Sequence, residues 1–376
     1  MSGDERAAND RAAGSAIGDS AIGGSATGGS ATGDDAARAR STRADSAQGA
    51  EFEELRPLLF SIAYRILGSV SEAEDAVQET WLRYAAAATE PTSVKAYLSA
   101  AVTRVSIDVL RSARVRREQY VGPWFPEPLL ADPYQDPERS AELADSVSMA
   151  ALLLLERLSP LERAVFVLRE VFAFSFPEVA AAVGRSEEAC RQLAVRARRH
   201  MDDGRPRFEA DRHEREELAE RFFGAFREGD VDGLRDLLAA DVYLLGDAGG
   251  NVPQWRRIDG AANVARLLAA LFAPFAQIGC VVEPREVNGQ PAAIVRDRDA
   301  KVVGIWTLDI LDGRIQAIRA LLNPEKLGHV GPTADARAVI REAYQGRRGT
   351  QPGTAGSEPG AGGPGSAASA ADDRVG

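Results

Sequence analysis

The sequence predicts a multidomain protein in which two all-α helical domains are followed by an α+β domain with a curved antiparallel sheet. Three observations predict this order. Residues 51–119 and 146–207 repeat their apolar side chains with the period of an α-helix. An acidic Pro-rich linker, residues 120–145, separates these two stretches. From residue 279 onward apolar and polar residues alternate, as they do in strands.

The first helical domain, residues 51–119, reverses its charge along the chain. Residues 51–90 carry eight acids and three arginines, whereas residues 91–119 carry six bases and two acids. Ser71 and Glu74 have the spacing of a capping box for a second helix, and Ser93 is placed to cap a third. The acidic stretch favours a basic protein partner, and the basic stretch favours phosphate.

An acidic stripe on the second expected helix is a candidate protein-binding face. Asp75, Gln78, Glu79 and Leu82 fall at positions i, i+3, i+4 and i+7, so they share one side of the helix. Trp81 and Leu82 put an apolar anchor beside the acids, which suits a protein interface. A solvated acidic face has the same pattern, so both interpretations stay open at this point.

The basic stretch is a candidate nucleic-acid face. Aromatic side chains next to arginines fit stacking on exposed bases as well as phosphate contact. A core position for the aromatic residue fits the pattern equally well. The candidate residues are Lys95, Tyr97, Arg104, Asp108, Arg111, Arg114, Arg116 and Arg117.

Residues 175–200, within the second helical domain, have the layout of a helix-turn-helix. Gly184 permits the tight turn and Ser186 is placed to cap the second helix. The outer side of that helix would lie in a major groove. An ordinary helical hairpin with solvated arginines is the alternative, but the cap, the glycine and the basic face together favour DNA. The candidate residues are Ser186, Glu187, Glu188, Arg191, Gln192, Arg196 and Arg199.

The third domain, residues 211–330, changes from helical to strand periodicity. Strands are predicted at residues 279–287, 292–295, 301–311 and 314–322, with turns at Asn288-Gly289 and Asp312-Gly313.

The two ends of the chain lack such periodicity. Residues 1–50 contain four near-identical pentads, and residues 331–376 are rich in small residues, so both are expected to be disordered apart from a short helix at 334–344.

Composition narrows the classes of function. The net charge of −11 argues against a protein that coats nucleic acid, so DNA contacts must come from local basic patches. Cys190 and Cys280 are the only cysteines and lack zinc-site spacing, so no metal or cofactor is expected. No apolar run approaches the roughly 20 residues that cross a bilayer. We therefore expect a cytoplasmic protein without a membrane partner.

Three stretches resemble regions 2 and 4 of an extracytoplasmic-function (ECF) sigma factor. They are FEELRPLLFSIAYRILGSVSEAEDAVQETWLRY, AYLSAAVTRVSIDVLRSARVRRE and LSPLERAVFVLREVFAFSFPEVAAAVGRSEEACRQLAVRARRHM, which lie between about residues 52 and 203. The resemblance implies two helical sigma domains and a transcription initiation factor that is not an enzyme. Its implied partners are core RNA polymerase and promoter DNA.

Three further segments resemble the SigJ-like subgroup, whose members carry a cone-shaped SnoaL-like C-terminal domain. The subgroup usually has Leu at position 125, Gly at 248 and Asp at 325. The residues that the resemblance marks as interdomain and regulatory are Trp124, Phe125, Pro126, Glu127, Pro128, Asp247, Gly249, Gly250, Asn323, Pro324 and Lys326.

The resemblance also implies roles for the two candidate faces. The Asp75, Gln78 and Glu79 pattern, with Leu82, would bind the clamp helices of the polymerase. Residues 95–117 would recognise and help melt the minus-ten element, and residues 186–199 would read the minus-thirty-five element. Many such sigma factors have Asn where Arg104 stands, so the base preference at this position is not carried over.

The third domain leaves several hypotheses open. It is expected to pack back onto the sigma regions as a built-in regulator, with a small-molecule effector in its cone as a further partner. SnoaL-like folds also host enzymes, and Asp247, Arg256, Arg257 and Asp259 are the candidate pocket lining. The alternatives are therefore a ligand-sensing helix-turn-helix regulator that acts without the polymerase core, and a SnoaL-like small-molecule enzyme.

Overall fold

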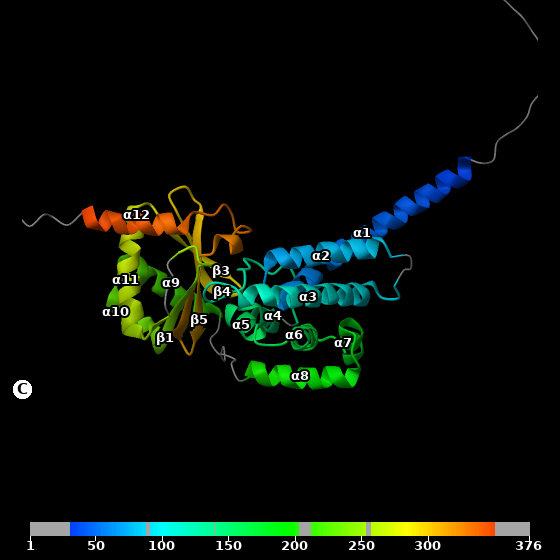
Figure 1. The fold of residues 1–376 in the computed structure, drawn as a ribbon, viewed down its shortest axis with the longest axis horizontal. Coiled ribbons are helices and arrows are strands. Elements are labelled where there is room, and N and C mark those ends of the chain that lie inside the picture. The colour runs from blue at the N-terminus through cyan, green and yellow to red at the C-terminus, as the bar shows by residue number, and fades with distance from the viewer. Residues whose placement is uncertain (1–30, 88–90, 139, 203–211, 253–256, 350–376) are drawn as a thin grey trace, which may run out of the picture. The chain divides into compact units, whose positions relative to one another are not determined.

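The computed structural model describes residues 31–87, 91–138, 140–202, 212–252 and 257–349 (Figure 1). The chain divides into two compact units, residues 1–51 and residues 52–376. Apart from the start of the first helix, every element and contact discussed below belongs to the second unit.

Three helices form the first helical domain: α1 (Ala31–Leu67), α2 (Val70–Ala85) and α3 (Val94–Glu118). Helix α1 begins inside the segment for which disorder is expected. The expectation is wrong for residues 31–50, because their alanines and arginines have high helix propensity. Residues 1–30 lie outside the described residues.

The cap of α2 differs from the one predicted. Gly68 adopts a φ of +69°, ends α1 and lets Ser69 precede α2 directly. The Ser69 side chain accepts a hydrogen bond from the backbone N of Glu72 at 3.1 Å, so the predicted Ser71 capping box is wrong. The predicted cap of α3 is confirmed, since the backbone N of Ala96 donates to Ser93 Oγ at 3.3 Å.

The second helical domain contains the predicted helix-turn-helix, formed by α7 and α8. Ser175 caps α7 with a capping box to Glu178, and Gly184 ends α7 in the left-handed conformation with φ +65°. The backbone N of Ala189 donates to Ser186 Oγ at 3.2 Å, as predicted. The helices are α4 (Ser140–Val147), α5 (Met149–Leu155), α6 (Pro160–Phe166), the π-helix η1 (Val167–Val171), α7 (Phe176–Val183) and α8 (Glu187–Asp202).

The linker is shorter than expected and is joined to both helical domains. Helix α4 already begins at Ser140, inside the segment predicted to be extended. The fully buried guanidinium of Arg65 on α1 pairs with the linker residue Asp132 at 2.8 Å. It also donates to Ser146 Oγ and to the Leu143 carbonyl, each at 2.8 Å, so α1 and α4 are held together.

In the third domain, the described strands form one six-stranded sheet in the order β2-β1-β6-β5-β4-β3. Helices α9, α10 and α11 cover one face of the sheet (Figure 1). The elements are α9 (Arg212–Glu228), α10 (Val231–Leu237), β1 (Leu238–Asp247), β2 (Ile258–Asp259), α11 (Ala261–Gln277), β3 (Val281–Val287), β4 (Gln290–Arg296), β5 (Val302–Leu311), β6 (Arg314–Leu321), the 3-10 helix η2 (Pro324–Lys326) and α12 (Ala336–Gly349).

The sheet is mixed, which corrects the prediction of a purely antiparallel one. Strands β3 to β6 form the expected antiparallel meander, but β1 pairs with β6 in parallel. The long connection between β1 and β6 contains α11 and four strands, so no tight turn forces the two to run in opposite directions.

Both predicted hairpin turns are confirmed. Asn288 and Gly289 join β3 to β4 with φ values of 55° and 65°, and Asp312 and Gly313 join β5 to β6 with φ values of 51° and 65°. Positive φ at both turn positions is the signature of a type I′ turn.

The C-terminal tail contains a helix longer than the short one predicted. Helix α12 runs from Ala336 to Gly349 and packs with Val339 and Ile340 against the apolar core of the third domain. The remaining tail, from residue 350, lies outside the described residues. Within the described ranges, no helix combines the length and apolarity needed to cross a bilayer.

Arg65 provides a test of how the two helical domains are joined. Arg65→Ala leaves the Asp132 carboxylate and several buried acceptors without their donor, so we expect the free energy of unfolding to fall by about 3–5 kcal/mol. Arg56→Ala is the matched control, because Arg56 lies on the same helix in an exposed pair with Glu74, and a change below about 1 kcal/mol is expected. Chemical denaturation measures both, and equal effects would contradict the assigned role.

Candidate functional site

The predicted acidic stripe lies on the outer side of α2. Asp75 and Gln78 are exposed, and Leu82 keeps 55% of its surface in solvent. Glu79 is half-buried and pairs with Arg83 at 2.8 Å. This combination of an exposed apolar side chain and acids suits a protein partner with basic groups.

Trp81 does not contribute the expected apolar anchor. Its ring lies 5.0 Å from that of Phe52, and the side chain packs against the core of the helical domains. Of the two residues predicted to form the apolar anchor, Trp81 and Leu82, only Leu82 forms it on this face.

The basic face of α3 is in contact with α7. Arg104 donates from Nε to the Ala182 carbonyl at 3.0 Å and from Nη2 to the Ala181 carbonyl. These carbonyls end α7, where a cation is favoured by the helix dipole. Hydrogen bonds from Ser175 lower the pKa of Glu178 on α7, and the nearby charge of Lys95 adds to the effect.

The remaining candidates on α3 differ in how far the structure describes them. Tyr97 is about one third exposed and its ring lies 5.9 Å from that of Tyr84, so it has both a core contact and a free edge. Asp108 and Arg111 are exposed and pair at 3.2 Å. The side chains of Arg114, Arg116 and Arg117 lie outside the described part of the chain.

The outer side of α8 presents its candidates to solvent. Arg191 pairs with Glu187 at 2.8 Å and lies 5.0 Å from the centre of the Phe176 ring. Arg196 pairs with Glu162 at 3.1 Å. The pair of Arg191 is exposed on both sides and contributes little free energy. Glu162 is largely buried, but the guanidinium of Arg196 is more than half exposed, so both arginines remain accessible to phosphate or bases. The other exposed candidates on this side are Ser186, Glu188, Gln192 and Arg199.

A buried carboxylate at the end of β1 binds the linker. Asp247 is fully buried and accepts hydrogen bonds from the backbone N of Phe125 at 2.8 Å, from Lys326 Nζ at 2.8 Å and from the Tyr120 hydroxyl. Burial and the hydrogen bond to Asp247 raise the pKa of Tyr120, so its hydroxyl stays protonated and donates.

Lys326 is the second charged residue that binds the linker at this carboxylate. Its Nζ donates to the Phe125 carbonyl at 2.6 Å and lies 4.5 Å and 4.3 Å from the ring centres of Tyr120 and Trp124. Aromatic faces stabilise a partly desolvated cation. Asp247 and Lys326 therefore bind the two polar groups of one linker residue while pairing with each other.

The remaining motif residues fit around this pair. Asn323 donates from Nδ2 to the Tyr120 hydroxyl at 2.9 Å. A Cβ at Gly249, which has a φ of +55°, would lie 2.5 Å from Asn323 Nδ2, so a larger residue would be strained and would clash. Gly250, with φ +79°, lies against Val121. Pro324 begins η2, whose cap is Asn323.

The linker also binds the first turn of α2. The buried carboxylate of Glu127 accepts from the backbone N of Val70 at 2.8 Å and of Ser71 at 3.1 Å, and from Ser69 Oγ at 2.8 Å. A carboxylate is favoured at a helix N-terminus. Pro126 and Pro128 on either side are buried, and the Pro128 carbonyl lies 2.6 Å from His329 Nε2. One linker thus contacts the helix with the acidic stripe and the third domain.

Tyr64, Tyr120, Asn288 and His329 belong to this interface but were missed by the sequence analysis. Asn288 was recognised only as a turn residue, and Tyr64 only as part of a helical stretch. The signal available for Asn288 was its turn chemistry, which does not say whether a hairpin tip is buried.

Among the described residues of the third domain, the candidate pocket residues do not come together. Asp247 binds the linker, whereas Arg257 and Asp259 form an exposed pair at 2.7 Å, and Arg256 lies outside the described residues. The interior of the cone has a volume of about 30 Å³ and is lined by apolar side chains such as Phe226, Trp306 and Ile340. This is the space of one or two water molecules.

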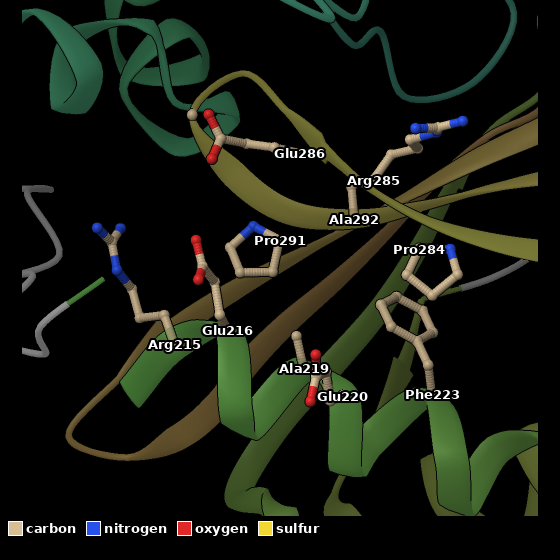
Figure 2. Close-up of a pocket in the computed structure, with 11 residues that line it drawn as sticks. Arg215, Glu216, Ala219, Glu220, Phe223, Pro284, Arg285, Glu286, Pro291 and Ala292 are labelled. Atoms are coloured by element: carbon tan, nitrogen blue, oxygen red, sulfur yellow. The ribbon is translucent and has the colours of Figure 1, made fainter. Parts of the chain in front are cut away.

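A larger groove of about 300 Å³ lies between α9 and the β3–β4 hairpin (Figure 2). Glu216, Glu220 and Phe223 on α9 face Pro291 and Pro284 of the hairpin across it. The lining also includes Arg215, Arg285 and Glu286. Charges of both signs and open access do not define one class of ligand.

Family comparisons agree with this division of the chain. Residues 52–116 match Sigma-70 region 2, residues 148–201 match Sigma-70 region 4, and residues 219–321 match the SnoaL-like domain family. Helical domains of these two types, with a helix-turn-helix in the second, define a sigma factor. Below, region 2 and region 4 denote residues 52–116 and 148–201, and the C-terminal domain denotes the third domain.

Individual relatives are similar over most of the chain. The sequence is 36% identical to the ECF RNA polymerase sigma factor SigJ of Mycobacterium tuberculosis over 287 residues, which are 74% of this chain and 92% of that protein. It is 31% identical to the probable ECF RNA polymerase sigma factor SigI of the same species over 275 residues, 72% and 92% of the two chains.

A solved structure shows the same fold. The crystal structure of M. tuberculosis SigJ superposes with a TM-score of 0.60 and 33% identity, covering 76% of this chain and 99% of that one. The chain belongs to the ECF RNA polymerase sigma factors. It directs transcription initiation and carries a SnoaL-like C-terminal domain.

Lys326 provides a test of the interface with the linker. Lys326→Met keeps most of the side-chain volume but leaves the buried Asp247 without its cation, so we expect the free energy of unfolding to fall by about 3 kcal/mol. Lys301→Met, at an exposed lysine of the same domain, is the control and should change it by less than about 0.5 kcal/mol. Denaturant titration measures the effect, and an unchanged midpoint for Lys326→Met would contradict it.

Proposed function

We propose that this sigma factor binds core RNA polymerase through α2, contacts promoter DNA through α3 and α8, and is regulated by its own C-terminal domain in the cytoplasm. The observation that carries the proposal is the buried linker, whose residues are bound on one side by region 2 and on the other by the C-terminal domain. The activity of the sigma factor would then depend on how tightly the C-terminal domain binds this linker.

The polymerase role of α2 is supported by the shape of its outer face. Asp75, Gln78 and Glu79 lie on the same stripe of α2 as the exposed Leu82, so two acids and an amide flank an apolar side chain. Interfaces of this composition exclude water at the centre and select the charge of the partner at the rim.

The promoter role is supported by two basic faces whose present partners are weak or replaceable. Arg191 and Arg196 on α8 form exposed ion pairs, and Arg104 on α3 is bound by main-chain carbonyls of α7. Phosphate competes well for such arginines, because contacts with DNA also release counterions. Recognition of the minus-ten element by α3 therefore requires its separation from α7.

The regulatory role is supported by the convergence of three segments of the C-terminal domain on the linker. An effector would shift the balance only if it bound one arrangement more tightly than the other. The cone interior, at about 30 Å³, must widen before it admits such a molecule. We propose no catalytic role for this domain, since the chemistry of transcription belongs to the polymerase.

Polymerase binding is tested by Asp75→Arg combined with Gln78→Ala. Charge reversal on this face should weaken binding to core polymerase at least a hundredfold, while the fold stays intact because both side chains are exposed. Asp299→Arg, at an exposed turn of the C-terminal domain, serves as the charge-reversal control. Affinity is measured by fluorescence anisotropy with reconstituted core enzyme.

Retained polymerase binding in the double variant would remove the assignment of this face. A protein that binds promoter duplex tightly without polymerase would instead be a ligand-sensing helix-turn-helix regulator, the alternative from another functional class.

The regulatory role is tested by truncation after Arg207. Removing the C-terminal domain frees the linker, so run-off transcription at limiting polymerase should rise severalfold relative to the full chain. Equal transcription at matched polymerase concentration would contradict regulation by this domain, and a fall would show that the domain activates. Turnover of a small apolar substrate by the isolated domain would instead identify an enzyme.

A further inference from the structure

The tip of the β3–β4 hairpin is buried, which is unusual for a two-residue turn. Asn288 is only 1% exposed. The β5–β6 hairpin has the same turn geometry at Asp312 and Gly313, yet both of its turn residues are exposed. The burial of Asn288 is therefore not a requirement of the turn and needs another explanation.

The side chain of Asn288 binds three separate segments outside its own domain. Its Nδ2 donates to the Tyr64 hydroxyl of region 2 at 2.7 Å and to the Val147 carbonyl, next to region 4, at 2.9 Å. Its Oδ1 accepts from the backbone N of the linker residue Leu129 at 3.0 Å. Both amide hydrogens and the amide oxygen are thus used by other parts of the chain.

The backbone of the turn adds to these contacts. The backbone N of Asn288 donates to the Leu129 carbonyl at 2.7 Å, so the turn and the linker share a main-chain hydrogen bond as well. A Cβ at Gly289 would lie 3.2 Å from the Ala144 carbonyl of α4, so the turn fits closely against that helix. Beside it, Met149 of region 4 and Phe125 of the linker pack against the sheet in one apolar cluster with Val287.

Tyr64 passes the contact on to the polymerase-binding helix. Burial raises the pKa of Tyr64, so its hydroxyl keeps its proton and donates to the Glu127 carbonyl at 2.6 Å while accepting from Asn288. The Glu127 carboxylate in turn binds the backbone N of Val70 and Ser71 in the first turn of α2. A continuous chain of hydrogen bonds and covalent structure, through Tyr64 and Glu127, therefore connects the hairpin tip to α2.

We propose that Asn288 is a positioning residue through which the C-terminal domain fastens region 2 to region 4 and fixes the placement of α2. The inference rests on the proposed function, because it names the contact by which the regulatory domain would act. An amide suits this position, since it supplies two donors and one acceptor without bringing a charge into the interior.

Asn288→Asp is the sharpest variant. Aspartate has nearly the same shape and occupies the equivalent turn position at Asp312, so the hairpin is retained. The substitution replaces the two donors with a carboxylate oxygen, which leaves the Val147 carbonyl without a partner and places a charge beside Tyr64. Tyr64→Phe removes the acceptor on the other side and is the milder variant. Asp312→Asn is the matched control at the exposed hairpin.

The arrangement is measured in the full chain without polymerase. Spin labels on Ser112→Cys in α3 and Asp299→Cys in the C-terminal domain are both at exposed positions, and the two native cysteines are buried. Pulsed dipolar spectroscopy then gives the distance distribution. The wild type and Asp312→Asn should give one narrow distance, which defines the fastened form. Asn288→Asp should add a second, broader distance population and lower the ratio of the fastened form to this released form about ten- to hundredfold.

Tyr64→Phe should give a smaller shift in the same direction, and it decides the matter if Asn288→Asp fails to fold. Distance distributions equal to the wild type in the folded variants would overturn the proposal. If Asn288 only stabilised its own hairpin, its substitution would lower the unfolding midpoint without changing the distance between the labels. That result would also overturn the proposal.

Polymerase affinity provides the second readout. If α2 is no longer held in place, the affinity of Asn288→Asp for core polymerase should change at least threefold. The affinity of Asp312→Asn should equal that of the wild type. Equal affinities for wild type and Asn288→Asp would remove the link to α2. The outcome is separable from that of the proposed regulation. A changed distance with unchanged transcription on truncation leaves Asn288 as the fastening residue and removes the regulatory function alone.

Discussion

The part of the linker from Tyr120 to Leu129 can be buried only because other parts of the chain form hydrogen bonds with its polar groups. The backbone N and carbonyl of Phe125 bind Asp247 and Lys326, and both backbone groups of Leu129 bind Asn288. A buried main-chain group without a partner costs about as much as a lost hydrogen bond, so an isolated linker would not adopt this path. The order of the linker depends on the C-terminal domain.

The same chemistry lets the interface come apart without leaving an isolated charge. Asp247 and Lys326 pair with each other at 2.8 Å as well as with the linker. If the linker departs, each ion keeps its counterion and gains water, whereas loss of either residue by mutation leaves the other ion alone in a poorly solvated site. A buried pair of this kind adds little net stability compared with apolar residues, but it specifies which segment fits. Such a contact suits the regulatory interface proposed above.

Local structure was predictable wherever it depends on a few neighbouring residues. The cap at Ser186, the left-handed turn at Gly184 and the turn at Asn288-Gly289 all follow from side-chain chemistry within four positions. The family motifs also located Asp247 and Lys326, although their pairing with the linker is visible only in three dimensions.

Apart from the cap of α2 and the helix at residues 31–50, the errors concern features set by distant residues. The parallel pairing of β1 with β6 depends on a connection of more than sixty residues, and the burial of Trp81 depends on Phe52. Neither is encoded by local periodicity. Asn288 and Asp312 make the point most clearly, because two turns of the same type differ only in what other domains place against them.

The contact between α3 and α7 limits what this arrangement can do on a promoter. The minus-ten and minus-thirty-five elements lie roughly 25 base pairs apart, about 85 Å along the duplex. Helix α8, with 16 residues, is about 24 Å long, and α7 precedes it directly. Because Arg104 on α3 is bonded to the end of α7, the two basic faces lie too close together to reach both elements at once. Under the proposed roles of α3 and α8, regions 2 and 4 separate on the promoter, and the free energy that fastens them is subtracted from that of polymerase binding.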